Sequence, residues 1–156
     1  MIDAVANAAE NRRVLTIRQL AEQEIDRVGS VLGLARLGAG TGFYLVAWED
    51  DEPVGHGYVA FTDPPELGDV FVLPQHRRRG IATALTAAAE RAVAARGSDR
   101  LRLSYGVAND AARTVYERSG YVDAGLPQKR VTGAITIRGE RVEVDDTLVY
   151  LEKRLR

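Results

Sequence analysis

Residues 69–82 read Asp69-Val70-Phe71-Val72-Leu73-Pro74-Gln75-His76-Arg77-Arg78-Arg79-Gly80-Ile81-Ala82. The β-branched and aromatic run that ends at Pro74 predicts a strand, and the apolar stripe that begins at Ile81 predicts a helix. Three arginines and a glycine therefore lie at the start of a helix, where unpaired N–H groups and the helix dipole attract anions. Gly80 lets a ligand approach the backbone closely, and the arginines add charge-assisted hydrogen bonds. This stretch predicts a phosphate-binding turn between a strand and a helix.

The rest of the chain predicts a single layered α/β domain. Strands are predicted at residues 14–20, 43–48, 54–61, 66–73, 101–105, 121–125 and 147–153. Helices are predicted at residues 21–37, 81–96 and 109–119, and a hairpin at 129–144 that turns at Arg138-Gly139-Glu140. Helices that interrupt a largely antiparallel series favour one mixed, mostly antiparallel twisted sheet of about seven strands, flanked by helices. We expect residues 1–13 to be a flexible arm and residues 14–156 to form one domain.

Composition excludes several classes of protein. The 156 residues include no cysteine and two histidines, which excludes a disulfide scaffold, a catalytic cysteine and the usual zinc sites. The net charge of −1 offers no electrostatic argument for binding nucleic acid or an anionic membrane. No apolar run approaches the ~20 residues that span a bilayer, and the N-terminus lacks the pattern of a signal peptide. We therefore expect a cytoplasmic protein without a metal site.

A second informative stretch, residues 109–121, reads Asn109-Asp110-Ala111-Ala112-Arg113-Thr114-Val115-Tyr116-Glu117-Arg118-Ser119-Gly120-Tyr121. Asn109 is a favourable N-cap for the predicted helix, because its side-chain oxygen can accept a backbone N–H of the first turn. Tyr116 carries a phenol with a reference pKa of about 10, which can serve as a general acid where it is held beside a leaving group. The alternative interpretation is a half-buried core tyrosine, and both can hold.

The two stretches together resemble the GNAT superfamily of acetyl-CoA-dependent N-acetyltransferases. The family's cofactor signature, R/Q-x-x-G-x-G/A at the start of a helix, is matched by Arg77, Gly80 and Ala82. Its helix pattern, N-x-x-A-x-x-x-Y-x-x-x-G-F/Y, is matched by Asn109, Ala112, Tyr116, Gly120 and Tyr121. The matches cover residues 66–121, and the order of predicted strands extends the resemblance to most of the chain. Residues 21–42 are short for the family, in which two helices usually shape the acceptor pocket.

The resemblance implies a cofactor site, made by Phe71, Val72, Arg77, Arg78, Arg79, Gly80, Ile81, Ala82, Thr83, Asn109 and Tyr116. In the family, the strand ending near Leu73 diverges from the fifth strand, and pantetheine fills the gap as a strand-like partner. The N–H of Phe71 or Val72 would then stabilise the oxyanion. Asn109 would contact the pantetheine arm, and Tyr116 would protonate the departing thiolate.

The incoming amine must be neutral to attack, so a base would assist it. Glu66 and Asp69 are the candidate catalytic carboxylates, although either could be a plain surface residue. His56 is another candidate, with a structural histidine as the alternative. His76 lies in the turn, and we expect it to be solvated.

Three functions remain open. The first is transfer of an acetyl group from acetyl-CoA to a primary amine, in a small molecule or a peptide, by direct attack in a ternary complex. The second is a sensor or scaffold that binds acetyl-CoA without turnover, because fold does not guarantee activity. The third is a nucleic-acid module that uses the arginine turn, which the net charge disfavours. We expect neither nucleic acid nor membrane as a partner, and the hairpin at 129–144 is either an acceptor-pocket wall or a contact in a homodimer.

Overall fold

The computed structural model describes residues 14–37, 40–137 and 140–155. Its helical elements are η1 (Glu22–Glu24), α2 (Ile25–Leu32), η2 (Pro74–His76), α3 (Ile81–Ala95) and α4 (Asp110–Arg118). Its strands are β1 (Leu15–Gln19), β2 (Gly42–Glu49), β3 (Glu52–Ala60), β4 (Glu66–Val72), β5 (Arg100–Gly106), β6 (Val122–Asp123), β7 (Lys129–Ile137) and β8 (Glu140–Arg154). The arm expected at residues 1–13 lies outside the described residues, as do residues 38–39, 156 and 138–139, the last of which belong to the expected hairpin turn.

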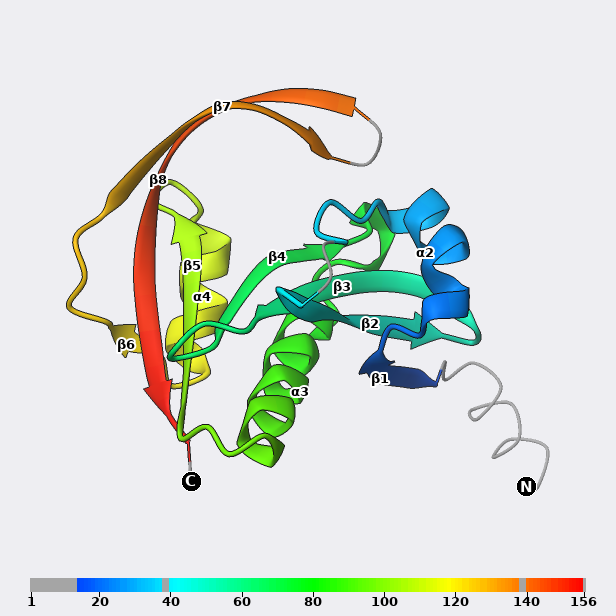
Figure 1. The fold of residues 1–156 in the computed structure, drawn as a ribbon, viewed down its shortest axis with the longest axis horizontal. Helices are drawn as coiled ribbons and strands as arrows, with labels where there is room; N and C mark the ends of the chain where they lie inside the picture. The colour runs from blue at the N-terminus through cyan, green and yellow to red at the C-terminus, as the bar shows by residue number, and fades with distance from the viewer. Residues whose placement is uncertain (1–13, 38–39, 138–139, 156) are drawn as a thin grey trace.

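The strands form one mixed sheet in the order β1-β2-β3-β4-β5-β8-β6, with β7 paired to β8 (Figure 1). Within the described residues, β4 and β5 are the only parallel neighbours, and every other pair is antiparallel. A parallel pair needs a crossover connection, which η2 and α3 provide. The expectation of a mostly antiparallel α/β sheet flanked by helices is confirmed, with eight strands rather than about seven.

Strand β2 is buried on both faces, and its side chains alternate between two hydrophobic cores. Phe43, Leu45 and Ala47 pack into the core that contains the apolar face of α3. Tyr44, Val46 and Trp48 pack into a second core with Val28 and Leu32 of α2. Because successive strand residues point to opposite faces, the sheet separates an α3 face, which also holds Tyr116 of α4, from an α2 face.

The sheet is open between β4 and β5. Their pairing is confined to Glu66↔Arg102 and Leu67↔Leu103, although β4 continues to Val72 and β5 to Gly106. The strands then run apart (Figure 1). We call the unpaired region beyond Leu67 and Leu103 the opening. It leaves one edge of each strand without a backbone partner, which is the property that allows a strand-like ligand to bind.

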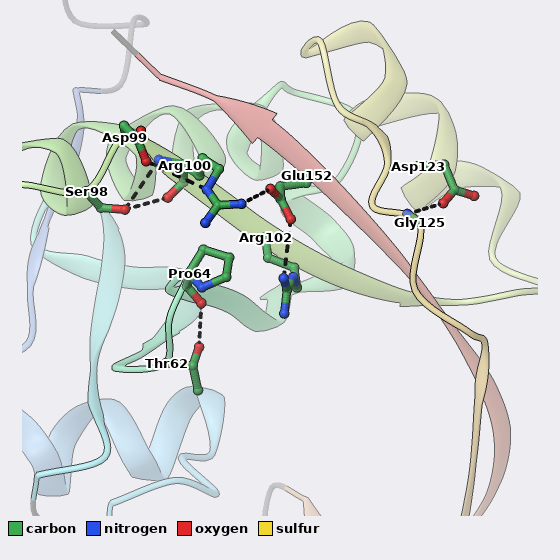
Figure 2. Close-up of polar contacts among 9 residues, drawn as sticks. All are labelled: Thr62, Pro64, Ser98, Asp99, Arg100, Arg102, Asp123, Gly125 and Glu152. Carbon is green, nitrogen blue, oxygen red and sulfur yellow. Dashed lines mark hydrogen bonds and ion pairs between the residues drawn. The ribbon is translucent and has the colours of Figure 1, made fainter.

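Polar contacts hold the closed end of β4 and β5. The backbone N–H of Arg102 donates to the Pro65 carbonyl at 2.9 Å. Across β8, Glu152 accepts from Arg100 at 3.0 Å and from Arg102 at 3.4 Å (Figure 2). These contacts tie the start of β4 to β5 and β8, so the two strands share a fixed origin from which they diverge.

The sequence predicted the bounds of α3 and α4 to within one residue. Helix α3 ends at Ala95, one residue earlier than predicted, and Gly97 takes the left-handed φ of 94° that suits its role after a helix end. Asn109 caps α4, since its Oδ1 accepts the Ala112 N–H at 3.0 Å.

Other boundaries were wrong. The helix predicted at 21–37 is only the η1 turn followed by α2, because Gly33, with a φ of 75°, ends the helix at Leu32. The strand predicted at 121–125 is reduced to β6. The strand predicted at 147–153 is the second half of the longer β8, whose first half pairs with β7 as the predicted hairpin. This hairpin extends from the sheet as a long curved ribbon (Figure 1).

The described helices contain no segment with the length and hydropathy of a bilayer-spanning helix.

We predict that Leu103→Ala destabilises the protein by about 2–5 kcal/mol, the usual cost of emptying a buried leucine site. Leu103 is fully buried and lies where β4 and β5 separate. Urea unfolding gives the measurement, with Val122→Ala as the control because Val122 is 67% exposed; its expected change is within about 0.5 kcal/mol. Equal losses in both variants would contradict this role of Leu103.

Candidate functional site

The turn between β4 and α3 exposes the start of a helix. Gly80 occupies the N-cap position with a φ of 80°, a left-handed conformation that glycine adopts without steric cost. Within the described part of the chain, no side chain caps α3, so the backbone N–H groups of Ile81, Ala82 and Thr83 lack an intrahelical acceptor. A Cβ on Gly80 would meet no atom within 4 Å. The turn therefore presents open N–H groups to an anion.

The three arginines of the turn lie in different directions. Arg77 folds back onto β4, where its Nε donates to the Val72 carbonyl at 2.9 Å and its guanidinium lies 5.7 Å from the centre of the Phe71 ring. Arg78 is exposed and has a positive φ of 62°. Arg79 turns toward the end of β2. All three arginines are exposed, and the side chains of Arg77 and Arg79 also bind atoms of the sheet.

Arg79 forms a two-pronged ion pair with Glu49, the last residue of β2. Its Nη2 donates to Oε2 at 2.7 Å and its Nη1 donates to Oε1 at 3.2 Å. The Glu49 side chain is only 2% exposed. Arg79 Nη1 also lies 2.9 Å from Nδ1 of His76, whose side chain is 14% exposed. The expectation of a solvated His76 was therefore wrong, because the ion pair draws this ring against the sheet.

The edge of β4 that faces the opening is set by the register with β3. Leu73 donates its N–H to the Val54 carbonyl at 2.9 Å, and His56 stands opposite Phe71. Because N–H groups alternate direction along a strand, the N–H of Phe71 faces β3 and that of Val72 faces the opening. Of the two sequence candidates for a backbone donor, the geometry singles out Val72.

Tyr116 lies on the α3 face of the sheet, in the same core as Leu67 and Leu103. The residue is 6% exposed, and its ring packs between Tyr105 and Tyr121 at centroid distances of 6.3 and 6.2 Å. Burial raises the pKa of Tyr116 to about 12, since a charged phenolate is disfavoured away from water. The hydroxyl thus keeps its proton at neutral pH. Both interpretations of Tyr116, core residue and proton donor, fit this position.

Asp69 lies on the α2 face, at an irregular point of β4 where the register with β3 shifts and its φ is 49°. Its Oδ2 accepts a hydrogen bond from the Tyr44 hydroxyl at 3.1 Å and lies 3.9 Å from Nδ1 of the buried His56. The Asp69 side chain remains 20% exposed. A carboxylate that is both anchored and open to solvent has the properties required of a base.

Tyr44 was not identified from the sequence, although it fixes Asp69. Its hydroxyl accepts the N–H groups of Ala35 and Arg36 at 3.1 and 3.0 Å, and it donates its proton to Asp69. Burial and the nearby Asp69 charge raise the pKa of Tyr44 to about 12. The only sequence signal was a tyrosine on an apolar strand, which is the ordinary pattern of a core residue.

Glu66, the other carboxylate expected to act, lies at the closed end of β4, opposite Arg102. It is three residues from Asp69, about 10 Å along an extended strand. The structure therefore does not bring Glu66 and Asp69 together. Among the described residues, no group of three or more His, Cys, Asp or Glu side chains could hold a metal ion.

The protein resembles solved acetyltransferase structures over most of its length. The IAA acetyltransferase from Bacillus cereus is 17% identical, with a TM-score of 0.70 over 91% of this chain and 100% of that one. The ribosomal-protein-S18-alanine N-acetyltransferase from Escherichia coli is 16% identical, with a TM-score of 0.68 over 91% and 94%. An acetyltransferase from Bacillus subtilis in complex with CoA is 15% identical, with a TM-score of 0.67 over 93% and 100%. These likenesses show a shared fold.

No curated protein matches the sequence. The model of the acetyltransferase (GNAT) family matches residues 11–121. This range includes the arginine turn, the opening and α4, and it is more than half of the sequence. The chain therefore belongs to the GNAT family of acetyltransferases.

Proposed function

We propose that the protein transfers an acetyl group from acetyl-CoA to a primary amine by direct attack in a ternary complex. The observation that carries this proposal is the opening between β4 and β5, with the open helix start of α3 beside it. Tyr116 lies on one face of the sheet and Asp69 on the other. This arrangement suits a reaction in which the amine approaches from the side of the carboxylate while the CoA thiolate departs on the side of the proton donor.

The residues fit acetyl-CoA, which supplies the acetyl group as a thioester. The N–H groups of Ile81, Ala82 and Thr83 would hold the pyrophosphate, with Arg78 adding charge from the exposed side of the turn. The unpaired edge of β4 would bind the amide groups of the pantetheine arm, in the manner of an added strand. Asn109, which already caps α4 through its Oδ1, would contact the same arm. The complex of the Bacillus subtilis acetyltransferase with CoA, which has a similar fold, supports this assignment.

Val72 would provide the main stabilisation of the transition state. Its N–H faces the opening, and its carbonyl is held by Arg77 at 2.9 Å. A fixed backbone donor is effective because it requires no reorganisation when negative charge develops on the acetyl oxygen. Removing such a donor typically costs about 10²–10³ in rate.

Asp69 would accept the proton of the incoming amine, directly or through a water molecule. Its hydrogen bond from Tyr44 fixes the orientation of the carboxylate, and its partial exposure lets the acceptor reach it. Glu66 is less suited to this role because it lies at the closed end of the strand pair. The acceptor is a small-molecule or peptide amine, and the name of one structural relative, the ribosomal-protein-S18-alanine N-acetyltransferase, specifies a protein amine.

We predict that purified protein releases free thiol from acetyl-CoA only when a suitable amine is present. The test is a panel of aminoglycosides, polyamines, amino acids and peptide N-termini, with acetylated product identified by mass. Binding of acetyl-CoA without transfer to any amine would contradict the proposed enzyme and favour a sensor or scaffold.

We predict that Tyr116→Phe lowers kcat by about 10²-fold, the lower range for loss of an acid catalyst. The dissociation constant of acetyl-CoA should stay nearly unchanged, since the ring and its packing remain. The reduction should be the same between about pH 7 and 9, because a phenol with a pKa of about 12 is fully protonated throughout. Wild-type turnover in the variant would show that Tyr116 is only a core residue.

We predict that Asp69→Asn lowers kcat at neutral pH by about 10²-fold, because an amide cannot take up the amine proton. The expected loss shrinks as the assay pH rises, since a larger fraction of the amine is then already neutral. Glu66→Gln is the matched control, with a predicted loss of less than about threefold. A larger loss in Glu66→Gln than in Asp69→Asn would reverse the two assignments.

A further inference from the structure

The acidic turn at the tip of the β2–β3 hairpin lies beside the basic turn at the start of α3. Glu49 and Glu52 face each other across the hairpin, and Asp50 and Asp51 between them have left-handed φ values of 50° and 67°. Glu52 and the Asp51 carbonyl bind Arg27. Glu49 is directed to the other side, where it binds Arg79 of the phosphate-binding turn. The tip of the β2–β3 hairpin is thus bound to the phosphate-binding turn through Glu49 and Arg79.

We propose that the ion pair between Glu49 and Arg79 positions the turn that binds pyrophosphate, so that Glu49, although an anion, increases the affinity for acetyl-CoA. This inference rests on the proposed function. We call the pair the latch. Arg79 and Glu49 are then positioning residues rather than groups that touch the cofactor.

The geometry favours an anchor over a direct phosphate contact by Arg79. Both terminal nitrogens of its guanidinium donate to the Glu49 carboxylate, a planar pairing that fixes the arginine in orientation as well as in place. Glu49 is buried and belongs to a strand that is covered on both faces. A buried carboxylate resists separation from a paired cation, because breaking an ion pair inside the protein is costly. Pulling Arg79 toward a ligand would therefore be opposed by the sheet.

The turn needs such an anchor because its own backbone is strained. Arg78 has a φ of 62° without being a glycine, and such a residue keeps this conformation only where its surroundings enforce it. Arg77 fastens the turn to β4 on one side of Arg78, and the latch fastens it to β2 on the other. The two side chains together hold the loop whose N–H groups must point at the ligand.

The latch and simple electrostatics predict opposite signs for Glu49→Gln. A carboxylate near a pyrophosphate repels it, so its removal should tighten binding, the more so because Arg79 would be released toward the phosphates. If Glu49 holds the turn in shape, its removal weakens binding instead. Calorimetric titration of the folded protein with CoA measures the difference directly.

We expect Glu49→Gln to raise the dissociation constant of CoA by about tenfold, within the range of coupling between neighbouring charged groups. Glu52→Gln is the matched control: it removes the same charge from the same hairpin, and its side chain is 71% exposed. Its expected effect is below about twofold. Unchanged or tighter binding of CoA by Glu49→Gln would overturn the latch.

A second measurement separates positioning of the turn from general loosening of the fold. S-acetyl-pantetheine carries the thioester arm without the pyrophosphate, so kcat/KM with this substrate should be equal in wild type and Glu49→Gln. For acetyl-CoA, the loss should lie in KM, with kcat at saturation within about twofold of wild type. A parallel loss with S-acetyl-pantetheine would overturn the inference.

Arg79→Lys provides an independent test that leaves a cation beside the buried carboxylate and so protects folding. The latch predicts weaker CoA binding in this variant, because lysine cannot make the two-pronged contact, and a less than additive further loss when Glu49→Gln is added, since both changes act on one interaction. Additive losses would identify Arg79 as a direct phosphate contact and overturn the latch. If wild-type protein fails to bind CoA, the proposed function falls as well; if wild type binds and only the variant results disagree, the latch alone falls.

Discussion

The separation of β4 from β5 is the constraint on which the rest of the molecule depends. Two register pairs join the strands, and beyond Leu67 and Leu103 each leaves its backbone edge open. Elsewhere in a sheet, neighbouring strands satisfy these groups, so an opening persists only where its ends are held apart. Glu152 with Arg100 and Arg102 fixes the closed end, and helix α3 packs beneath the diverging strands. The opening is therefore a feature of the folded core.

The two faces of the sheet divide the chemistry. On the α3 face lie the open helix start and the buried Tyr116, which suit a ligand that is long, anionic at one end and reactive at the other. On the α2 face, the Tyr44 hydroxyl donates a hydrogen bond to Asp69. The same hydroxyl accepts hydrogen bonds from the backbone N–H groups of Ala35 and Arg36, which follow α2. In the proposed reaction, the two substrates meet at the opening. Membership of the GNAT family agrees with a reaction that joins two substrates across it.

The sequence was most informative where a property is local. The helix start at Gly80 and the Asn109 cap depend on residues within a few positions of one another, so a short pattern specifies them. Tyr44 and Asp69 are 25 positions apart, and Glu49 and Arg79 are 30 apart. Such contacts exist only once the strands are in register. No periodicity reveals them, and the sequence therefore does not show that Arg79 pairs with Glu49.

Pantetheine is proposed to occupy the opening, and a crystal structure of the protein with coenzyme A tests this most directly. We expect the pantetheine arm between β4 and β5, the pyrophosphate on the N–H groups at the start of α3, and the thiol beside the Tyr116 hydroxyl. Coenzyme A bound at another surface, with β4 and β5 unchanged and their edges unoccupied, would contradict this proposal.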